Sequence, residues 1–185
     1  NIKALYHKND LVPFGEFLPI ESILNKIGLR SVTNNYLSFS KGNRRDIINI
    51  NNNDFKLNIL PLICYEIIYS GKLSKNNNYD LIINISEDGW FGKSIGPHQH
   101  FVHSVFRAIE EGKSIIRSSN NGISAIIDPK GKILKINKST TSGVLSTYGF
   151  EKLSEITIFS LYGRNNIFFY LVLIYITLIF FLKRQ

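Results

Sequence analysis

An uncharged apolar segment near the end of the chain, Ile167–Leu182, limits most strongly what this sequence can fold into. Its sixteen residues would span about 24 Å as a helix, close to the hydrocarbon core of a bilayer, which is about 30 Å thick. Lys183 and Arg184 follow directly and can extend their charges to a membrane surface. The pattern predicts a transmembrane helix over residues 165–183 and a cytoplasmic tail over residues 184–185. The alternative is a buried helix, or a pair of strands, at the end of a water-soluble domain.

Residues 1–160 have the alternating strand and helix pattern of one α/β domain. Leu81–Ser86 is almost entirely apolar, which is typical of a strand in a sheet covered on both faces. Pro97 suits the first turn of a helix and Gly112 its end, with apolar residues at helical spacing between them. The Asn-rich stretch Asn43–Asp54 is expected to be a surface loop. The other expected elements are a helix at Ile67–Leu73 and strands at Ala4–His7, Leu57–Ile63, Ser114–Ser118, Ile123–Ile127 and Lys132–Ile136.

The composition excludes several classes of protein. The net charge is +8, but no stripe of Lys and Arg alternates with aromatic residues, so a nucleic-acid-binding surface is not predicted. A single cysteine, Cys64, excludes an internal disulfide and a metal site with several cysteine ligands. The chain begins at Asn1 and contains no methionine, so we expect a piece of a longer protein whose N-terminal part is missing.

Cys64 stands where an apolar predicted strand passes into a predicted helix. A nucleophile on such a turn projects from the edge of a sheet, and nearby backbone N–H groups can bind an oxyanion. The partial positive charge at a helix N-terminus also favours a thiolate. The alternative is a small buried hydrophobic residue. Glu66, two residues later, favours the catalytic interpretation, because a buried carboxylate at this turn needs a partner.

Lys8 and Glu16 flank a second unusual segment, rich in polar and turn-forming residues. A lysine can stabilise an oxyanion or, if it is desolvated, exchange protons, and a nearby carboxylate would orient it. The alternative is an exposed lysine in a loop.

A third segment, Asn84–Gly92, ends a predicted strand with polar residues, an aromatic pair and glycines. This pattern is typical of a loop that lines a pocket at the carboxyl end of a strand. Trp90 and Phe91 either face a bound acyl chain or pack in the core. No metal is predicted, because without a carboxylate partner the spacing of the histidines that follow does not bring them to one point. These histidines are His98, His100 and His103.

Four segments in this order carry a family resemblance: YHKNDLVPFGEFLP (6–19), LICYE (62–66), NISEDGWFGKSIGPHQHF (84–101) and RAIEEGKSIIRSSNNGISAIIDPKG (107–131). Together with the apolar tail they resemble the apolipoprotein N-acyltransferase family, a branch of the nitrilase or carbon-nitrogen hydrolase superfamily. The resemblance implies a nitrilase-like αββα sandwich without its N-terminal portion, over residues 1–160, followed by one C-terminal transmembrane helix. Departures are mild: Glu87 stands where the family commonly has Asn, and Ser118-Ser119 where Ala-Thr is common.

The resemblance also implies a Glu–Lys–Cys active site. Cys64 matches the nucleophile, and Lys8 matches the lysine that stabilises the tetrahedral intermediates. Glu16 matches an acidic residue near that lysine, while Tyr65 and Glu66 match the residues that shape the site around the nucleophile. The general-base Glu of the family lies further upstream and has no counterpart in this sequence.

The implied reaction moves an acyl chain from a phospholipid, through a Cys64 thioester, to the N-terminal amine of a diacylglyceryl-cysteine lipoprotein. Phe14, Trp90 and Phe91 are expected to bind substrate, and neither a metal nor an organic cofactor is needed. The implied location is the bacterial inner membrane, with the catalytic domain periplasmic and the C-terminus cytoplasmic. The implied partners are both lipid substrates, the membrane and the missing N-terminal part of the same enzyme. The alternatives are a nitrilase-type amidase and a catalytically inactive fragment of the acyltransferase.

Overall fold

The computed structural model describes residues 2, 4–17, 19, 38–43, 45–52, 55–71, 73–74, 77–138 and 141–183, with the side chains of residues 164 and 165 excepted. Its elements, in chain order, are β1 (Ile48–Asn51), β2 (Lys56–Ile63), the 3₁₀-helix η2 (Cys64–Ile68), β3 (Leu81–Glu87), the 3₁₀-helix η3 (Gly89–Phe91), α2 (Gly96–Glu111), β4 (Ser114–Asn120), β5 (Ser124–Ile127), β6 (Ile133–Asn137) and α3 (Ile158–Leu182).

The strands form one mixed sheet in the order β1-β2-β3-β4-β5-β6. The central strands β2, β3 and β4 run parallel, and β1, β5 and β6 pair antiparallel at the two sides. A parallel pair needs a crossover connection, and α2 supplies it between β3 and β4. The predicted α/β class is therefore confirmed. The carboxyl ends of β2 and β3 lie next to each other, because Ile63 pairs with Ile85.

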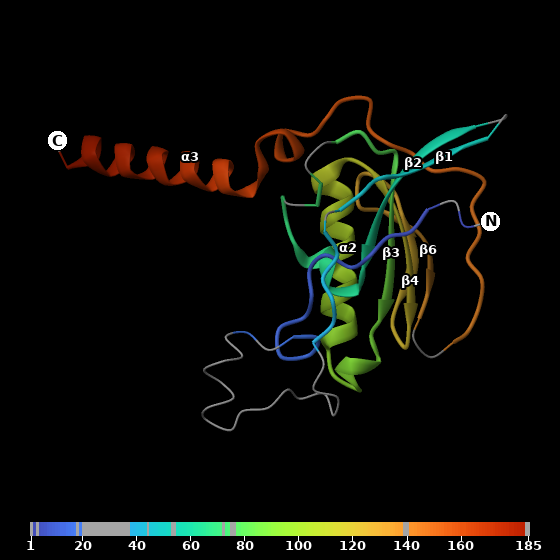
Figure 1. Cartoon of the computed structure of the whole chain (residues 1–185). Helices are drawn as coiled ribbons and strands as arrows, with labels where there is room; N and C mark the ends of the chain where they lie inside the picture. Colours follow the sequence, from blue (N-terminus) through green and yellow to red (C-terminus); the bar gives the residue numbers. More distant parts are fainter. Residues whose placement is uncertain are drawn as a thin grey trace, which may run out of the picture.

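The core lies between α2 and one face of the sheet (Figure 1). Alternate strand residues point to this face, and α2 contributes Phe101 and Ala108. Pro97 lies in the first turn of α2, and Gly112 ends the helix in the left-handed conformation with φ +62°, as predicted. The sheet side chains of this core are Leu60, Leu62, Ile82, Ile115, Ala125 and Ile127.

The opposite face of the sheet is less covered. Ile85 follows the buried Asn84 in β3, so its side chain points away from α2, and it is 52% exposed. In Figure 1, α2 lies against the sheet while α3 projects away from it. An apolar residue at the centre of a parallel sheet is normally covered, so this face has room for a further layer.

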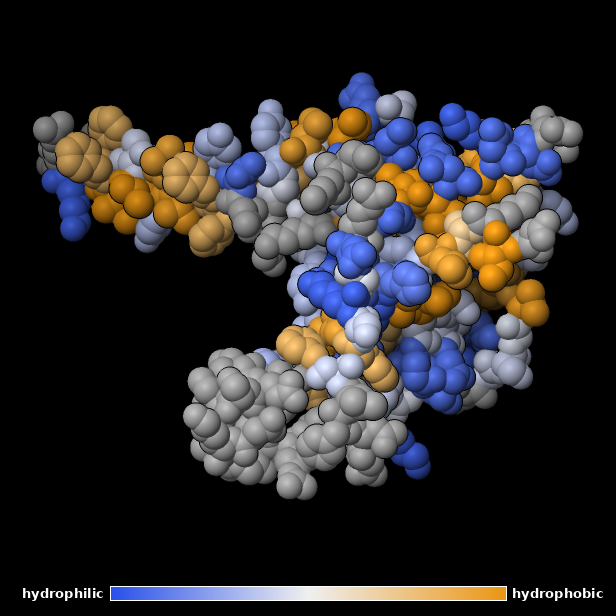
Figure 2. Space-filling view, in the orientation of Figure 1, coloured by the Kyte–Doolittle hydropathy of each residue, from blue (hydrophilic) through white to orange (hydrophobic). Residues whose placement is uncertain are grey.

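α3 occupies the position of the predicted terminal helix, but it is not continuous. Gly163 has non-helical angles (φ 67°, ψ 167°) and separates the first turn from the apolar part. From Phe168 to Leu182 nearly all side chains are exposed and hydrophobic (Figure 2). Within the described ranges, no helix combines the length and the apolar character needed to cross a bilayer. The predicted transmembrane helix at residues 165–183 is therefore not supported.

Three smaller predictions were wrong. Ala4–His7 is not a strand, because Tyr6 and the nearby Asn9 hydrogen-bond to Glu66 instead of to a neighbouring strand. The expected loop Asn43–Asp54 contains β1, whose alternating Ile and Asn residues pair with β2. The expected helix Ile67–Leu73 is replaced by η2, which is shorter and begins at Cys64 itself.

Candidate active site

Cys64 lies where β2 passes into η2, with φ +51°. This left-handed conformation is strained for a residue with a β-carbon and marks a sharp elbow in the chain. The thiol is partly exposed, and Sγ lies 4.0 Å from the carbonyl oxygen of Glu87 on β3. Because η2 has only five residues, its dipole is smaller than that of the longer helix expected from the sequence. The strained elbow, rather than a helix dipole, is the main feature of this cysteine.

Glu66 fixes the elbow to the N-terminal segment. Its fully buried carboxylate accepts hydrogen bonds from the backbone N–H groups of Ile63 (2.7 Å), Asn9 (2.6 Å) and Asp10 (3.2 Å). It also accepts one from the Tyr6 hydroxyl at 2.9 Å, and burial together with the Glu66 charge raises the pKa of Tyr6. We call this set of contacts the Glu66 clamp. It connects the segment that carries Lys8 to the turn that carries Cys64.

Lys8 and Glu16 form a close ion pair at the end of that segment. Lys8 Nζ lies 2.6 Å from Glu16 Oε1, and both side chains are mostly buried. The other Glu16 oxygen accepts the backbone N–H of Val12 at 2.9 Å, within a turn whose backbone also bonds Val12 to Glu16. These contacts give the ion pair a fixed position in the turn.

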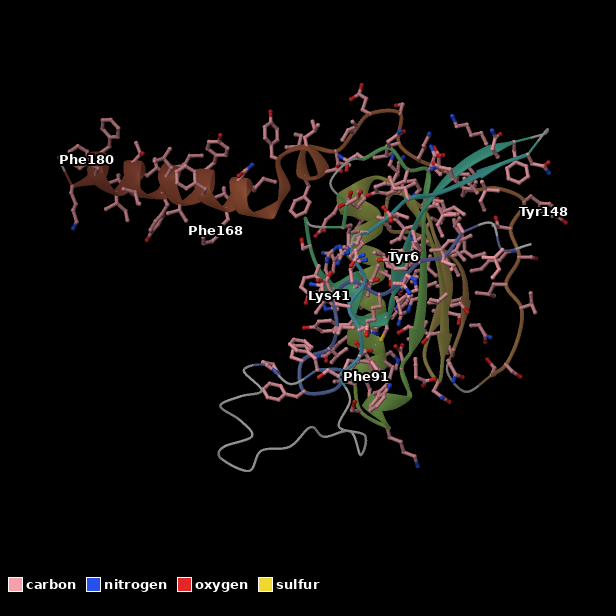
Figure 3. The ribbon with its side chains drawn as sticks, viewed as in Figure 1. Tyr6, Lys41, Phe91, Tyr148, Phe168 and Phe180 are labelled. Carbon is pink, nitrogen blue, oxygen red and sulfur yellow. The ribbon has the colours of Figure 1, made fainter. Side chains whose placement is uncertain are left out.

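A cavity of about 340 Å³ is lined by five of the predicted site residues, whereas Lys8, Glu66 and Phe14 do not line it. Cys64, Tyr65 and Glu16 line it, and so do Trp90 and Phe91 from η3. Figure 3 shows Phe91 in this part of the molecule, far from Phe168 and Phe180 on α3. Lys8 contacts this group through Glu16.

The predicted substrate-binding aromatics differ in position. Trp90 is 74% exposed at the rim of the cavity, and Phe91 packs against the ring of His100 at 5.6 Å between centroids. Phe14 is 51% exposed, has φ +62° and lies beside Gly15, which lines the cavity. Trp90 and Phe91 are therefore well placed to contact an apolar ligand, whereas Phe14 lies just outside the lining.

A buried polar network behind the cysteine was not predicted from the sequence. Arg117 of β4 donates to Asp88 Oδ2 at 2.7 Å, to Asn84 and to the carbonyl oxygen of Ile123. Asp88 Oδ1 lies 2.8 Å from His100 Nδ1, and His100 Nε2 lies 3.2 Å from the carbonyl oxygen of Cys64. We call Asp88 with Arg117, Ser86 and His100 the Asp88 clamp.

The charges in this network are strongly coupled. Burial favours the neutral form of Asp88, but the His100 hydrogen bond and the Arg117 charge outweigh it and hold the pKa of Asp88 well below its usual range. Burial lowers the pKa of Arg117, which Asp88 partly offsets. A sequence signal existed: Asn84 interrupts the apolar run of β3, Arg117 directly follows Ile115 and Ile116 in β4, and the two residues lie opposite each other in the β3–β4 register.

Two further groups complete the site. Glu87, on the cavity wall, accepts hydrogen bonds from Asn121, from the backbone N–H of Gly89 and from Asn120, which lower its pKa. His103 also lines the cavity, where burial lowers its pKa. Among the described residues, no group of three or more His, Cys, Asp and Glu side chains is arranged to hold a metal ion.

The fold and the cysteine site define a class of protein that sequence comparison also identifies. The family model for carbon-nitrogen hydrolases matches residues 1–148, and the chain belongs to this family. Within it, the chain is similar to curated proteins named apolipoprotein N-acyltransferase. The relative from Rickettsia typhi is 42% identical over 178 residues, which cover 96% of this chain and 34% of the relative. The relative from Wigglesworthia glossinidia brevipalpis is 40% identical over 194 residues, which cover 99% of this chain and 36% of the relative.

The chain thus spans about a third of the length of these relatives. Among solved structures, an amidase from Nesterenkonia sp. aligns with 55% of this chain and 40% of its own at 15% identity, with a TM-score of 0.42. That likeness is too distant to support an argument about this site.

Proposed function

We propose that this chain carries the nucleophile of an apolipoprotein N-acyltransferase. The observation that carries the proposal is the strained Cys64 elbow, which opens into a cavity shared with the acidic partner of Lys8. The acyl donor would be a phospholipid, and the acceptor the free N-terminal amine of a diacylglyceryl-cysteine lipoprotein. The similarity to curated acyltransferases supports this choice of substrates.

In the first proposed step, the Cys64 thiolate attacks the carbonyl carbon of the phospholipid ester. The Lys8 ammonium and a backbone N–H group stabilise the tetrahedral oxyanion, and one such donor is worth about 3 kcal/mol in comparable sites. The lysophospholipid alcohol leaves with a proton, and the acyl chain stays on sulfur as a thioester. The base that takes the thiol proton is proposed to be a Glu from the part of the enzyme that this chain does not contain.

In the second step, the neutral amine of the lipoprotein attacks the thioester. The tetrahedral intermediate collapses, Cys64 leaves as a thiolate, and the amine loses a proton to give an amide. A covalent intermediate suits two bulky substrates, because each binds in turn to the same cavity. No cofactor takes part in either step.

The proposed location is the bacterial inner membrane, with α3 in contact with lipid and residues 1–160 on the periplasmic side as the C-terminal portion of a catalytic αββα sandwich. The exposed hydrophobic surface of α3 supports lipid contact, and the exposed Ile85 supports a further layer on the open face of the sheet. The missing N-terminal part of the enzyme is the proposed source of that layer.

A nitrilase-type amidase is the second candidate, and the family match favours it because carbon-nitrogen hydrolases include such enzymes. The same Cys64 and Lys8 would serve, with water as the acceptor. The exposed apolar α3 and the aromatic rim at Trp90 and Phe91 favour lipid substrates instead. A third possibility, an inactive fragment, is favoured by the share of its relatives that this chain spans.

A chimeric protein tests these candidates. This chain would replace the matching third of the Rickettsia typhi relative, and the chimera would be expressed in a strain depleted of its own acyltransferase. We expect growth to be restored, and the same chimera with Cys64→Ala to fail. Equal rescue by both would exclude the thioester. In vitro, transfer to water but not to a lipopeptide amine would favour the amidase, and no thioester at all would favour the inactive fragment.

A further inference from the structure

His100 is buried beside the proposed nucleophile, and its contact there is with the cysteine backbone. The residue is 5% exposed, and Nε2 lies 3.2 Å from the carbonyl oxygen of Cys64. A carbonyl oxygen can only accept a hydrogen bond, so the proton between these atoms belongs to Nε2. His100 therefore holds the peptide oxygen of the residue that carries the thiol.

The orientation of that peptide decides where a neighbouring donor points. The Cys64–Tyr65 peptide is planar and trans, so the Cys64 carbonyl and the Tyr65 N–H point in opposite directions. Tyr65 is the second residue of η2, and the first N–H groups of a helix have no partner within it. When His100 fixes the carbonyl, it also fixes the Tyr65 N–H, which is a candidate donor to an oxyanion formed at Cys64.

His100 can fix the carbonyl because its own ring is fixed. Asp88 holds Nδ1 at 2.8 Å, and Asp88 is held in turn by Arg117 at 2.7 Å and by the Ser86 hydroxyl at 2.7 Å. The ring of Phe91 packs against the imidazole from the cavity side. The charged groups that face His100 are thus Asp88 and Arg117, which are both buried.

We propose that His100 is a positioning residue: its Nε2 proton holds the Cys64 carbonyl and thereby directs the Tyr65 N–H to the oxyanion formed at Cys64. This role rests on the proposed cysteine acyl chemistry. It explains why a left-handed cysteine keeps one orientation, since a non-glycine residue with φ +51° needs its surroundings to hold it there.

Two substitutions of His100 form a matched pair. In His100→Gln the side-chain amide reaches the position of Nε2 and donates to the Cys64 carbonyl. In His100→Asn the shorter amide reaches the position of Nδ1, contacts Asp88 and leaves the carbonyl without its donor. Both substitutions remove the imidazole ring that packs against Phe91, and each keeps one of its two hydrogen bonds: that to the Cys64 carbonyl in His100→Gln and that to Asp88 in His100→Asn.

Two reactions of Cys64 separate positioning from general damage. Acylation by p-nitrophenyl butyrate passes through an oxyanion and gives a burst of p-nitrophenol, whereas alkylation by iodoacetamide forms no oxyanion. At a pH of about 9, where a cysteine of ordinary acidity is mostly ionised, neither reaction needs a general base. We expect His100→Asn to slow acylation by about tenfold or more and alkylation by much less, and His100→Gln to keep acylation close to that of the unchanged chain. Equal acylation rates in the two variants would overturn the role of His100 alone. No burst from the unchanged chain would refute the cysteine acyl chemistry and this role with it.

A measurement on the unchanged chain keeps the proposal testable if either variant fails to fold. With ¹⁵N-labelled histidine, NMR distinguishes a protonated ring nitrogen from an unprotonated one. We expect Nε2 of His100 to carry a proton, and its signal to shift when Cys64 is acylated. An unprotonated Nε2 would overturn the proposal regardless of the variants.

Discussion

Two buried carboxylates hold the Cys64 elbow, and different kinds of donor satisfy them. The Glu66 clamp uses backbone N–H groups and the Tyr6 hydroxyl, and the nearest described cation is Arg45, with Nε 4.0 Å from the carboxylate. The Asp88 clamp uses the Arg117 guanidinium and His100. The first connects the elbow to the segment carrying Lys8, and the second connects it to β3, β4 and α2. Loss of the buried Arg117 charge from the Asp88 clamp should therefore have its main effect on stability, whereas damage to the Glu66 clamp should have its main effect on acyl transfer.

The largest effect on stability is expected from Arg117→Met. Arg117 and Asp88 are both fully buried, so this substitution leaves a buried carboxylate without its cation. Removing one partner of such a pair costs about 3–5 kcal/mol. The free energy of unfolding, from urea titration, should fall by that amount. Arg117→Lys keeps the charge but loses the hydrogen bonds to Asn84 and Ile123. Its free energy of unfolding should therefore lie between those of the unchanged chain and Arg117→Met. If Arg117→Met lowers the free energy of unfolding by less than Glu66→Gln does, the proposed difference between the two clamps is wrong.

Glu66→Gln should have a smaller effect on stability and a larger one on acyl transfer. The amide keeps one acceptor oxygen but turns an NH₂ group towards backbone donors, which costs about 1–3 kcal/mol. The segment that carries Lys8 should then loosen, because Asn9 and Asp10 lose their acceptor when the NH₂ group takes the place of Oε1. Hydrogen exchange should quicken at Asn9 and stay unchanged at Ile115 in the core. Equal quickening at both positions would mean that Glu66 supports the whole fold and not the segment.

The elements were more predictable from the sequence than the clamps. β2 and β3 were predicted because nearly continuous apolar runs are typical of buried parallel strands. α2 was predicted mainly from its ends at Pro97 and Gly112, since most of its buried side chains are polar. β1 was missed because its Asn residues resemble those of a loop, and only pairing with β2 makes them a strand. The Asp88 clamp joins Asp88, His100 and Arg117, which lie far apart in the chain, and no local pattern reports such an arrangement.

The two clamps should also differ in their response to pH. The pKa of Tyr6 is raised above its unfolded value of 10.0, so its contribution to stability is complete below about pH 10 and is lost as the pH rises further. The pKa of Asp88 is depressed below its unfolded value of 3.8, so its contribution is present above that value and is lost only as the pH falls through the lower folded value.

Raising the pH above about 10 should therefore reduce the contribution of the Glu66 clamp to stability and leave the contribution of the Asp88 clamp unchanged. Tyr6→Phe removes the titrating hydroxyl, and we expect it to reduce the fall in unfolding free energy between about pH 10 and 11. Tyr69 and Tyr79, whose pKa values are also raised, should account for the decline that is left. An identical decline in the unchanged chain and in Tyr6→Phe would remove Tyr6 from this explanation.

The smallest effect is expected from Glu87→Asn. This substitution tests whether a carboxylate supports the elbow because it is buried or because it lies near Cys64. Glu87 is a third carboxylate beside the elbow, and its backbone carbonyl lies 4.0 Å from the thiol. Its side chain, however, is held by Asn120, Asn121 and the Gly89 N–H at the surface, where water replaces lost partners. The unfolding midpoint should match that of the unchanged chain. A loss comparable to that at Glu66 would show that distance from the cysteine, and not burial of the carboxylate, determines how strongly each group supports the elbow.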